Sequence, residues 1–188
     1  MEDSLRGQFL IATPRLRDPN FFKTAVLMIE HGEEGAMGLV VNRPSSMTVA
    51  QALTGHLDLP EHDDLVFDGG PVEPNALFIV HNCPNLDPNE RPIVPGVYMG
   101  SSAKVFEDAV CDGPNGPHQL EFRLYCGCAG WAPGQLEGEL SRGDWLVVPG
   151  DSDSVFTDQP YRLWDQLLNK SYEANRLLPH ICDNPELN

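Results

Sequence analysis

The stretch Gly7–Pro44, GQFLIATPRLRDPNFFKTAVLMIEHGEEGAMGLVVNRP, carries the strongest fold signal of this chain. Three apolar runs lie within it, at Gln8–Thr13, Thr24–Glu30 and Met37–Asn42, and the last two are rich in β-branched residues. These two runs are joined by residues 31–35 (HGEEG), whose glycines on both sides of two acids favour a hairpin-type connection. The stretch therefore predicts antiparallel strands.

Further short elements are expected along the rest of the chain. The expected strands are Leu65–Phe67, Ala76–His81, Val97–Gly100, Gln119–Cys126 and Trp145–Val148. The expected helices are Ser45–Leu57, Ala103–Val110, Pro133–Arg142 and Pro160–Asn169. Between Asn82 and Pro95 three prolines interrupt a polar sequence, which predicts a mobile surface loop.

The segment Gln119–Cys126 has the clearest strand pattern, because apolar and polar residues alternate along it. Strict alternation is typical of a strand with one buried face. We therefore expect one face of its sheet to meet solvent or a partner.

Strands and helices are mixed without a regular β-α alternation, and neither a repeat nor a linker divides the chain. A chain of 188 residues buries roughly 70% of its unfolded surface in one core. We therefore expect one α+β domain over residues 1–188, with mainly antiparallel pairing and a core at about residues 5–170. The tail from Pro179 is expected to be frayed.

The net charge of −16 is divided evenly between the two halves of the chain. Residues 1–94 carry 14 acids and 6 Lys or Arg, and residues 95–188 carry the same, so each half has a charge of −8. Nucleic-acid binding draws much of its affinity from basic side chains that neutralise phosphates. Direct nucleic-acid binding is therefore not expected.

The chain shows no basic stretch followed by a long apolar run, so we expect neither a signal peptide nor a membrane span. Its five cysteines are irregularly spaced, and a chain of this size needs no disulfide staples. Reduced thiols in a cytoplasmic protein are the expectation.

Three blocks of the sequence resemble the signature blocks of the bacterial YqgE/AlgH family, also called UPF0301 or DUF179. They are Gly7–Pro44, Phe67–His81 (FDGGPVEPNALFIVH) and Tyr125–Glu139 (YCGCAGWAPGQLEGE). The similarity runs from about Leu5 to about Trp164. It implies a compact α+β fold around a barrel-like or mixed β-sheet flanked by helices. The family's regulatory name comes from an association with alginate control in some members, and the resemblance implies no settled reaction, cofactor or catalytic residue.

The pair Cys126-Gly-Cys128 could place two thiolates on one metal ion, but a structural zinc site needs four ligands and no second pair lies nearby. The family more often has an aliphatic residue and a tyrosine here, so a buried small apolar pair is the favoured interpretation. The histidines lack zinc-protease spacing, and no nucleophile elbow or phosphate-binding loop occurs. The sequence therefore predicts no metal and no cofactor.

The most suggestive site is Asn42-Arg43-Pro44-Ser45-Ser46, where a cation precedes an expected helix N-terminus. Free N–H groups there favour an anion, and Arg43 could bind a carboxylate or phosphate through two parallel hydrogen bonds from its guanidinium group. In the alternative interpretation Arg43 pairs with an acid such as Glu33 or Asp68, and Ser45 and Ser46 only cap the helix.

Other residues of the family-like blocks could line a cleft with Arg43. They are His31, Glu33 and Glu34 of the hairpin, Gly69 and Gly70, and Trp131. A histidine beside carboxylates could perform acid–base work if buried, although such loop residues are usually solvated. Trp131 is interpreted mainly as a packing anchor, and an exposed Trp131 would mark a binding surface.

The sequence thus predicts a cytoplasmic binding or regulatory factor that acts through an unidentified small anion or protein partner. One alternative is a hydrolase or transferase that uses His31 with Glu33 or Glu34. Another is a transcriptional regulator that contacts DNA directly, which the net charge disfavours. Neither the ligand nor the oligomeric state follows from the sequence.

Overall fold

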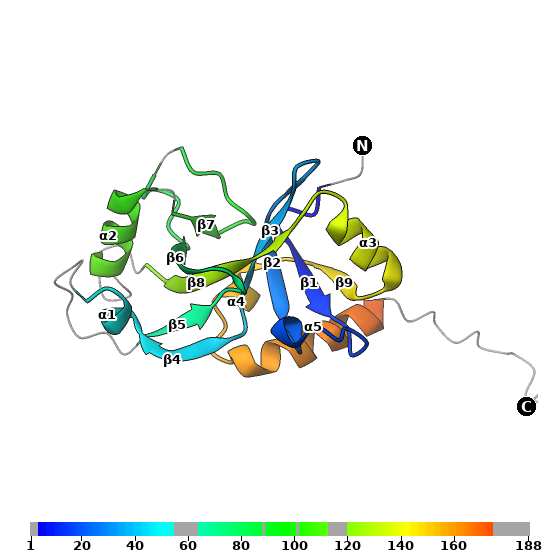
Figure 1. The fold of residues 1–188 in the computed structure, drawn as a ribbon. Coiled ribbons are helices and arrows are strands. Elements are labelled where there is room, and N and C mark those ends of the chain that lie inside the picture. Colours follow the sequence, from blue (N-terminus) through cyan, green and yellow to red (C-terminus); the bar gives the residue numbers. More distant parts are fainter. Residues whose placement is uncertain (1–3, 55–63, 88, 101, 113–119, 175–188) are drawn as a thin grey trace, which may run out of the picture.

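The computed structural model describes residues 4–54, 64–87, 89–100, 102–112 and 120–174 (Figure 1). The strands are β1 (Gln8–Ala12), β2 (Ala25–Gly32), β3 (Gly35–Val40), β4 (Pro44–Thr48), β5 (Leu65–Asp68), β6 (Val72–His81), β7 (Tyr98–Met99), β8 (Phe122–Trp131) and β9 (Trp145–Pro149). The helices are α1 (Val49–Ala52), α2 (Ala103–Asp112), α3 (Gln135–Arg142), α4 (Ser152–Val155) and α5 (Pro160–Ala174), with a 3₁₀ turn, η1, at Pro19–Phe21.

The strands join in one mixed sheet whose main path runs β4-β5-β8-β3-β2-β1-β9. Strand β6 pairs with β8, and β7 pairs with β6. The β5–β8 pairing is parallel, and the other pairings between described strands are antiparallel. The expected α+β domain with a mixed, mainly antiparallel sheet is confirmed. The path has two free ends, at β4 and β9, so the sheet does not close on itself.

Strand β8 links the two parts of this sheet. Its residues 122–128 pair with β6, and Tyr125 and Cys126 also face β5. Its last residues, 129–131, pair instead with β3. The two ends of β8 therefore lie in different environments, although the strand is only ten residues long.

Three glycines allow the chain to cross at the middle of β8. Gly70 has φ +143° and Gly127 has φ +69°, values that favour a residue without a Cβ atom. A Cβ on Gly70 would lie 2.4 Å from the carbonyl carbon and oxygen of Cys128, and one on Gly69 would lie 2.2 Å from the Gly127 carbonyl oxygen. Backbone packs directly on backbone here, so the Gly69-Gly70 turn has a structural role.

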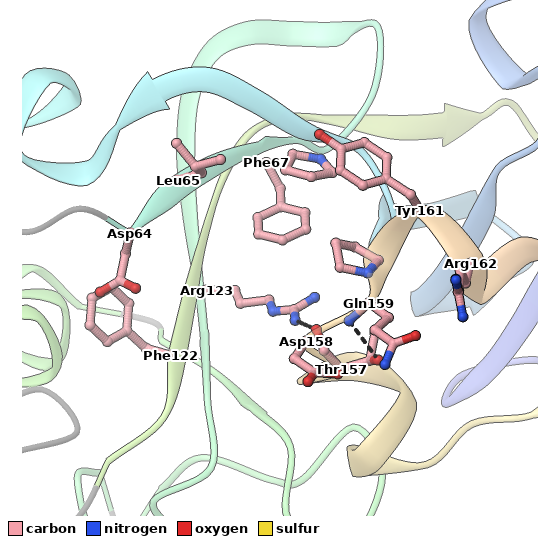
Figure 2. A pocket seen from close by; sticks show the side chains of 12 residues that line it. Asp64, Leu65, Phe67, Phe122, Arg123, Thr157, Asp158, Gln159, Tyr161 and Arg162 are labelled. Atoms are coloured by element: carbon pink, nitrogen blue, oxygen red, sulfur yellow. Dashed lines mark hydrogen bonds between the residues drawn. The ribbon is translucent and has the colours of Figure 1, made fainter.

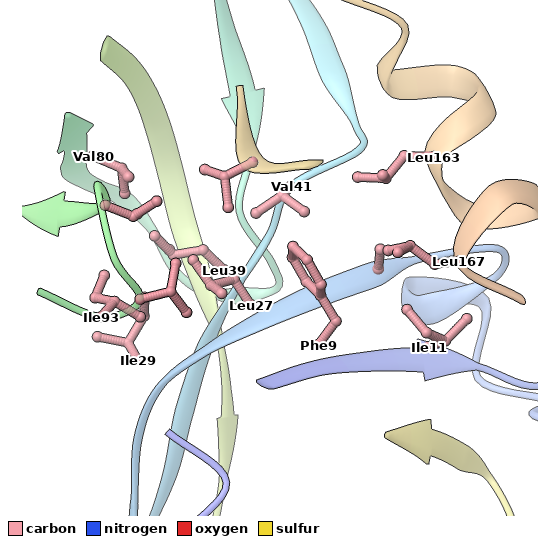
Figure 3. Packing of buried hydrophobic residues seen from close by; sticks show 14 of the residues in the cluster. Phe9, Ile11, Leu27, Ile29, Leu39, Val41, Val80, Ile93, Leu163 and Leu167 are labelled. Atoms are coloured by element: carbon pink, nitrogen blue, oxygen red, sulfur yellow. The ribbon is translucent and has the colours of Figure 1, made fainter. Parts of the chain in front are cut away.

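Both faces of the β1–β2–β3 region are buried. On one face, Phe9, Leu27 and Leu39 belong to a cluster to which α5 contributes Leu163 and Leu167 (Figure 3). The alternate residues of the same strands form a second cluster, to which α3 contributes Leu136. A sheet covered on both faces needs apolar residues at successive positions, which explains the continuous run Thr24–Ile29. The helices α1 and α2 cover a third cluster with β6 and β8.

Most of the expected elements are confirmed, including the α5 face made by Leu163, Trp164, Leu167 and Leu168. The helix expected over Ser45–Leu57 is wrong in its first part, because residues 44–48 form the edge strand β4. Pro44 pairs there with Phe67 and Thr48 with Leu65, so sheet pairing overrides the helical periodicity. The helix α1 begins only after Thr48, whose side chain forms a reciprocal capping box with Gln51.

The expectation that one face of Gln119–Cys126 meets solvent or a partner holds for only part of the segment, because Glu121 is exposed and Arg123 is partly exposed, whereas Tyr125 is buried. Leu124 is fully buried under α2, and Tyr125, which points the other way, is fully buried in the α5 cluster. The polar side of the strand therefore changes environment along its length, from solvent at Glu121 to a second core at Tyr125.

The segment between Asn82 and Pro95 is partly anchored to the sheet. Buried His81 and Glu90 form a contact of 3.0 Å between Nε2 and Oε2, and Arg6 donates to the carbonyl of Pro92 at 3.1 Å. Ile93 and Val94 are buried, so the segment is not wholly a surface loop, and its mobility stays a prediction. Within the described ranges, none of the helices combines the length and the apolar character that crossing a bilayer requires. The frayed tail expected from Pro179 lies outside the described residues.

Candidate functional site

Arg43 lies at the start of β4 and is held by the chain around η1. Its guanidinium donates to the carbonyl oxygen of Asn20 at 2.9 Å and to that of Phe22 at 3.4 Å. It also pairs with the Asp68 carboxylate, 3.7 Å away. The alternative in which Arg43 pairs with an acid is therefore the arrangement that the structure shows, and the acid is Asp68.

The neighbours of Arg43 are also engaged in local structure. The buried Asn42 side chain accepts a hydrogen bond from the Ala25 amide at 2.8 Å and donates to the Lys23 carbonyl at 2.9 Å. The Ser45 hydroxyl accepts from the Met47 amide at 3.1 Å, and Ser46 is exposed on the same strand. Because β4 replaces the expected helix turn, the expectation that these serines cap a helix is wrong.

His31 stands at the end of β2 and is bonded through both ring nitrogens. Nδ1 accepts a hydrogen bond from the Leu5 amide at 3.1 Å, so the neutral ring carries its proton on Nε2 and donates it to Glu137, 3.0 Å away. A bond to its own backbone amide, followed by the bond from His31, lowers the pKa of the Glu137 carboxyl. Glu33 and Glu34 are exposed, and the carboxylate beside His31 comes from α3 instead.

Trp131 is 5% exposed and is a packing anchor, as the favoured interpretation held. Its indole N–H donates to Oε2 of Glu139 at 2.9 Å, and the indole N–H of Trp145 donates to the same oxygen at 2.8 Å. Phe21 stacks on Trp131 with ring centroids 6.1 Å apart. A single carboxylate of α3 thus satisfies two buried indoles.

The predicted site residues therefore lie in three different places. Arg43 and Asn42 hold the chain near η1, Gly69 and Gly70 form the backbone crossing, and His31 and Trp131 bind acids of α3. These residues have local structural partners and do not line one common cleft.

An open cavity of about 580 Å³ lies instead beside β5, the N-terminal half of β8 and the segment 157–162 that leads into α5 (Figure 2). Apolar side chains supply much of its wall, and polar groups come from residues 157–162. The residues that matter most for its chemistry are Pro44, Phe67, Arg123, Gln159, Tyr161 and Arg162.

Arg123 differs from the other charged residues that line the cavity in being partly buried. Asp64, Asp158 and Arg162 are exposed. Its guanidinium lies over the ring of Phe67, with 4.5 Å from Cζ to the ring centroid. It donates to the carbonyl oxygen of Thr157 and, at 3.4 Å, to that of Val41. Figure 2 shows the side chain reaching from β8 toward Thr157. Burial lowers the pKa of Arg123, but a guanidinium stays protonated at neutral pH.

Tyr125 lies two residues further along β8, with its ring 5.5 Å from that of Phe67. Among the described residues its buried hydroxyl has no hydrogen-bond partner within bonding geometry. Burial raises the pKa of Tyr125 to about 12, while the nearby charge of Arg123 opposes that shift. The phenol is therefore neutral at physiological pH and does not neutralise Arg123.

Sequence reasoning placed Arg123 on the polar face of a strand and gave it no role. The available signal was a basic residue in a strand whose next polar-face residue, Tyr125, is aromatic. Residues 157–162 carry no motif, and they reach Arg123 only through the path of the chain from β9 through α4. The local sequence could not show that Arg123 and residues 157–162 lie side by side.

The two central cysteines of β8 do not act as one pair. Gly127 interrupts the strand's alternation with its positive φ, so Cys126 packs beside the α1–α2 cluster and Cys128 in the α5 cluster. Burial raises the pKa of both thiols, which keeps them protonated at neutral pH. The described part of the chain contains no group of three His, Cys, Asp or Glu side chains that could hold a metal ion.

Comparison with known proteins places this fold among bacterial relatives. The family model of AlgH-like proteins, DUF179, matches residues 9–173. A UPF0301 protein of Chlorobium chlorochromatii is 34% identical over 181 residues, covering 96% of this chain and 92% of the relative. Another from Streptomyces avermitilis is 36% identical over 190 residues, covering 98% and 96%. The solution structure of the AlgH protein from Pseudomonas aeruginosa is similar with a TM-score of 0.73 and 30% identity, covering 96% of this chain and 97% of that one.

Proposed function

This chain belongs to the AlgH-like family, and from that premise we propose that it is a cytoplasmic regulatory protein that binds a small organic ligand in the Arg123 cavity. Binding, rather than chemistry performed on the ligand, is the activity. A regulatory role agrees with the family's name, and the ligand would supply the signal.

The cavity itself carries the proposal. Its volume of about 580 Å³ falls within the range of roughly 300–1,000 Å³ that is typical of small-molecule sites. Such sites combine apolar walls with a few polar groups that orient the ligand. Phe67, Pro44 and Tyr161 supply apolar surface here, and Arg123 and Gln159 supply the polar groups.

The catalytic alternative receives less support from the geometry. It requires His31 to work with Glu33 or Glu34, but both acids are exposed and His31 is bonded to Leu5 and Glu137. A histidine with both nitrogens engaged in structural bonds has no free nitrogen with which to take a proton from a substrate. The alternative of direct DNA contact remains disfavoured by the net charge of −16.

The proposal can be tested by titrating the isotope-labelled protein with a fragment library that contains neutral, cationic and anionic molecules. We expect some fragments to shift the backbone NMR signals of β5, residues 122–125 of β8 and residues 157–162. Tyr161, 74% exposed at the cavity, can be truncated without opening a core. Tyr161→Ala should weaken the binding of these fragments by about fivefold, since an aromatic wall contributes on the order of 1 kcal/mol.

The matched control is Tyr172→Ala, which removes the other exposed tyrosine of α5, 52% exposed and outside the cavity lining. This variant should bind the same fragments as the unmodified protein. If fragments of every charge class leave the cavity signals unmoved, or if both tyrosine variants behave alike, the proposed function is wrong.

A further inference from the structure

We propose that the cavity selects organic anions, namely molecules that carry a carboxylate or a phosphate on a ring. The oxyanion would meet Arg123, and the ring would lie among Phe67, Pro44 and Tyr161. This inference rests on the proposed function, because it names the class of ligand for the same site.

The positive charge of Arg123 is the first reason. Its described hydrogen-bond acceptors are two backbone carbonyl oxygens, and it lies over the face of Phe67, all of which are neutral. Burial lowers the pKa of Arg123, and the charge of the exposed Glu121 partly opposes that shift. The neighbouring Tyr125 hydroxyl is neutral as well, because it remains protonated. A partly buried charge beside neutral partners attracts an anion more strongly than a solvated one does, since water screens it less.

The acids that also line the cavity are placed less favourably for neutralising Arg123. Asp158 is exposed, so water surrounds its carboxylate. Asp64 is exposed too, and Figure 2 shows it on the opposite side of the cavity from the Thr157–Gln159 segment. Neither acid is hydrogen-bonded to the guanidinium in the structure, as far as the described residues show. Among the charged residues that line the cavity, Arg123 is thus the one that is partly buried.

Further donors stand near Arg123. Gln159 and Arg162 line the same cavity, and both belong to the segment that Arg123 contacts through Thr157. A guanidinium is planar and can donate two parallel hydrogen bonds to one carboxylate or phosphate. An oxyanion at this wall would thus meet one fixed cation from β8 and polar groups from the start of α5.

The apolar half of the cavity argues for a ring rather than a bare ion. Pro44, Phe67 and the exposed Tyr161 present flat surfaces, which suit stacking with an aromatic ligand. An inorganic anion would leave these surfaces in water and would use only a small part of the space. The chain as a whole carries −16, so an anion gains nothing from the overall charge and must be held by these local contacts.

The test compares benzoate and phenyl phosphate with the uncharged benzamide and with inorganic phosphate, using calorimetry and NMR titration of the full chain. Benzoate or phenyl phosphate should bind about tenfold or more tightly than benzamide, as expected for a charge-assisted bond in place of a neutral one. Either anion should also bind more tightly than inorganic phosphate. A preference for benzoate would assign a carboxylate, and a preference for phenyl phosphate would assign a phosphate.

Variants then identify the group that recognises the anion. Arg123→Gln should abolish the preference over benzamide, and Arg123→Lys should keep part of it. Arg162→Gln, at an exposed position, tests the same wall without disturbing buried structure and should reduce the preference. The control Arg142→Gln removes an exposed arginine that pairs with Asp144 away from the cavity, and it should change nothing.

Two outcomes would overturn the inference and leave the proposed function standing. In the first, benzamide binds as tightly as benzoate while Tyr161→Ala still weakens both. In the second, inorganic phosphate binds as tightly as phenyl phosphate, which would exclude the ring. If no probe binds and the fragment library also fails, both proposals fall together.

Discussion

The two ends of strand β8 show opposite ways of using polar side chains. At the C-terminal end, Trp131 and its neighbour Trp145 donate to one carboxylate, that of Glu139. At the N-terminal end, Arg123 rests on carbonyl oxygens and an aromatic ring beside an open cavity. The polar groups of the first end satisfy each other, whereas the charge of the second has neutral partners.

This difference distinguishes a structural set of polar residues from a candidate binding residue within one strand. A buried polar group with a complete set of partners stabilises the fold and offers nothing to a ligand. A charge with incomplete compensation costs stability, and it persists where binding uses it. The Trp131 end lies in a family-like block and was therefore singled out in the sequence. The Arg123 end has the open cavity and the incompletely compensated charge that a binding site would use.

The largest expected effect concerns the glycine crossing that holds the two ends together. Gly70→Ala places a Cβ 2.4 Å from the Cys128 backbone at φ +143°. We expect a loss of about 3–5 kcal/mol in the free energy of unfolding, from backbone strain plus overpacking. Urea denaturation followed by circular dichroism measures it.

Gly134→Ala provides the control for that strain. This glycine also has a positive φ, +74°, but no atom lies within 4 Å of the added Cβ among those of the described residues. It should lose only about 1 kcal/mol, from the left-handed conformation alone. Equal losses in the two variants would show that close backbone packing is not what Gly70 provides.

The next effect tests the Trp131 end of β8. Glu139→Ala leaves two buried indole N–H groups without their acceptor, so we expect a loss of about 2–4 kcal/mol in unfolding free energy. Tryptophan fluorescence during denaturation reports the change directly. Glu137→Ala, on the same helix, loses a bond at a partly exposed carboxylate and should cost about 1 kcal/mol or less. Similar costs would contradict the central role of Glu139.

A smaller effect is expected at the Arg123 end. Arg123→Met keeps the length of the side chain and its contact with Phe67 but removes the charge. Replacing a partly buried charge by an apolar group is often near neutral, so stability should change by about 1 kcal/mol or less. A loss as large as that of Glu139→Ala would mean that Arg123 is structural, and the comparison between the two ends would fail.

The smallest effect is a pH dependence at the His31–Glu137 pair. The pKa of Glu137 is lowered from its ordinary value of 4.5 in the folded chain, so the pair's contribution is present above that pH. It is lost as pH falls below 4.5 through the lowered pKa. The melting temperature of Glu137→Gln should lie slightly below that of the unmodified protein at pH 7, and the difference should shrink as the pH is lowered below 4.5. A difference that does not shrink with falling pH would contradict this origin.

Much of the fold could be predicted because its signals are local. The apolar runs at β1, β2 and β3, the hairpin between the last two, and the inward face of α5 follow from periodicity and turn residues. The error at Ser45–Leu57 arose because Val49, Ala52 and Leu53 have helical spacing, whereas residues 44–48 are drawn into the sheet by β5. Edge pairing depends on a distant segment, which no local pattern reports.

The candidate site was predictable only in part. The pairing of Arg43 with Asp68 and the packing role of Trp131 were among the interpretations that the sequence allowed. The Glu137 partner of His31 was not, because 106 residues separate the two along the chain. The cavity was missed for the same reason, since Arg123 and residues 157–162 meet only in the folded protein.

The sequence by itself determined the family, the α+β class, the hairpin and the positions of the buried strands, because these depend on composition, short-range spacing and three continuous blocks. Only the tertiary structure decided which polar residues are satisfied and which face an open cavity. Hydrogen-bond partners and desolvation depend on groups that are distant in the chain. Arg123 therefore appears as ordinary strand surface in the sequence and as the cation of a cavity wall in the fold.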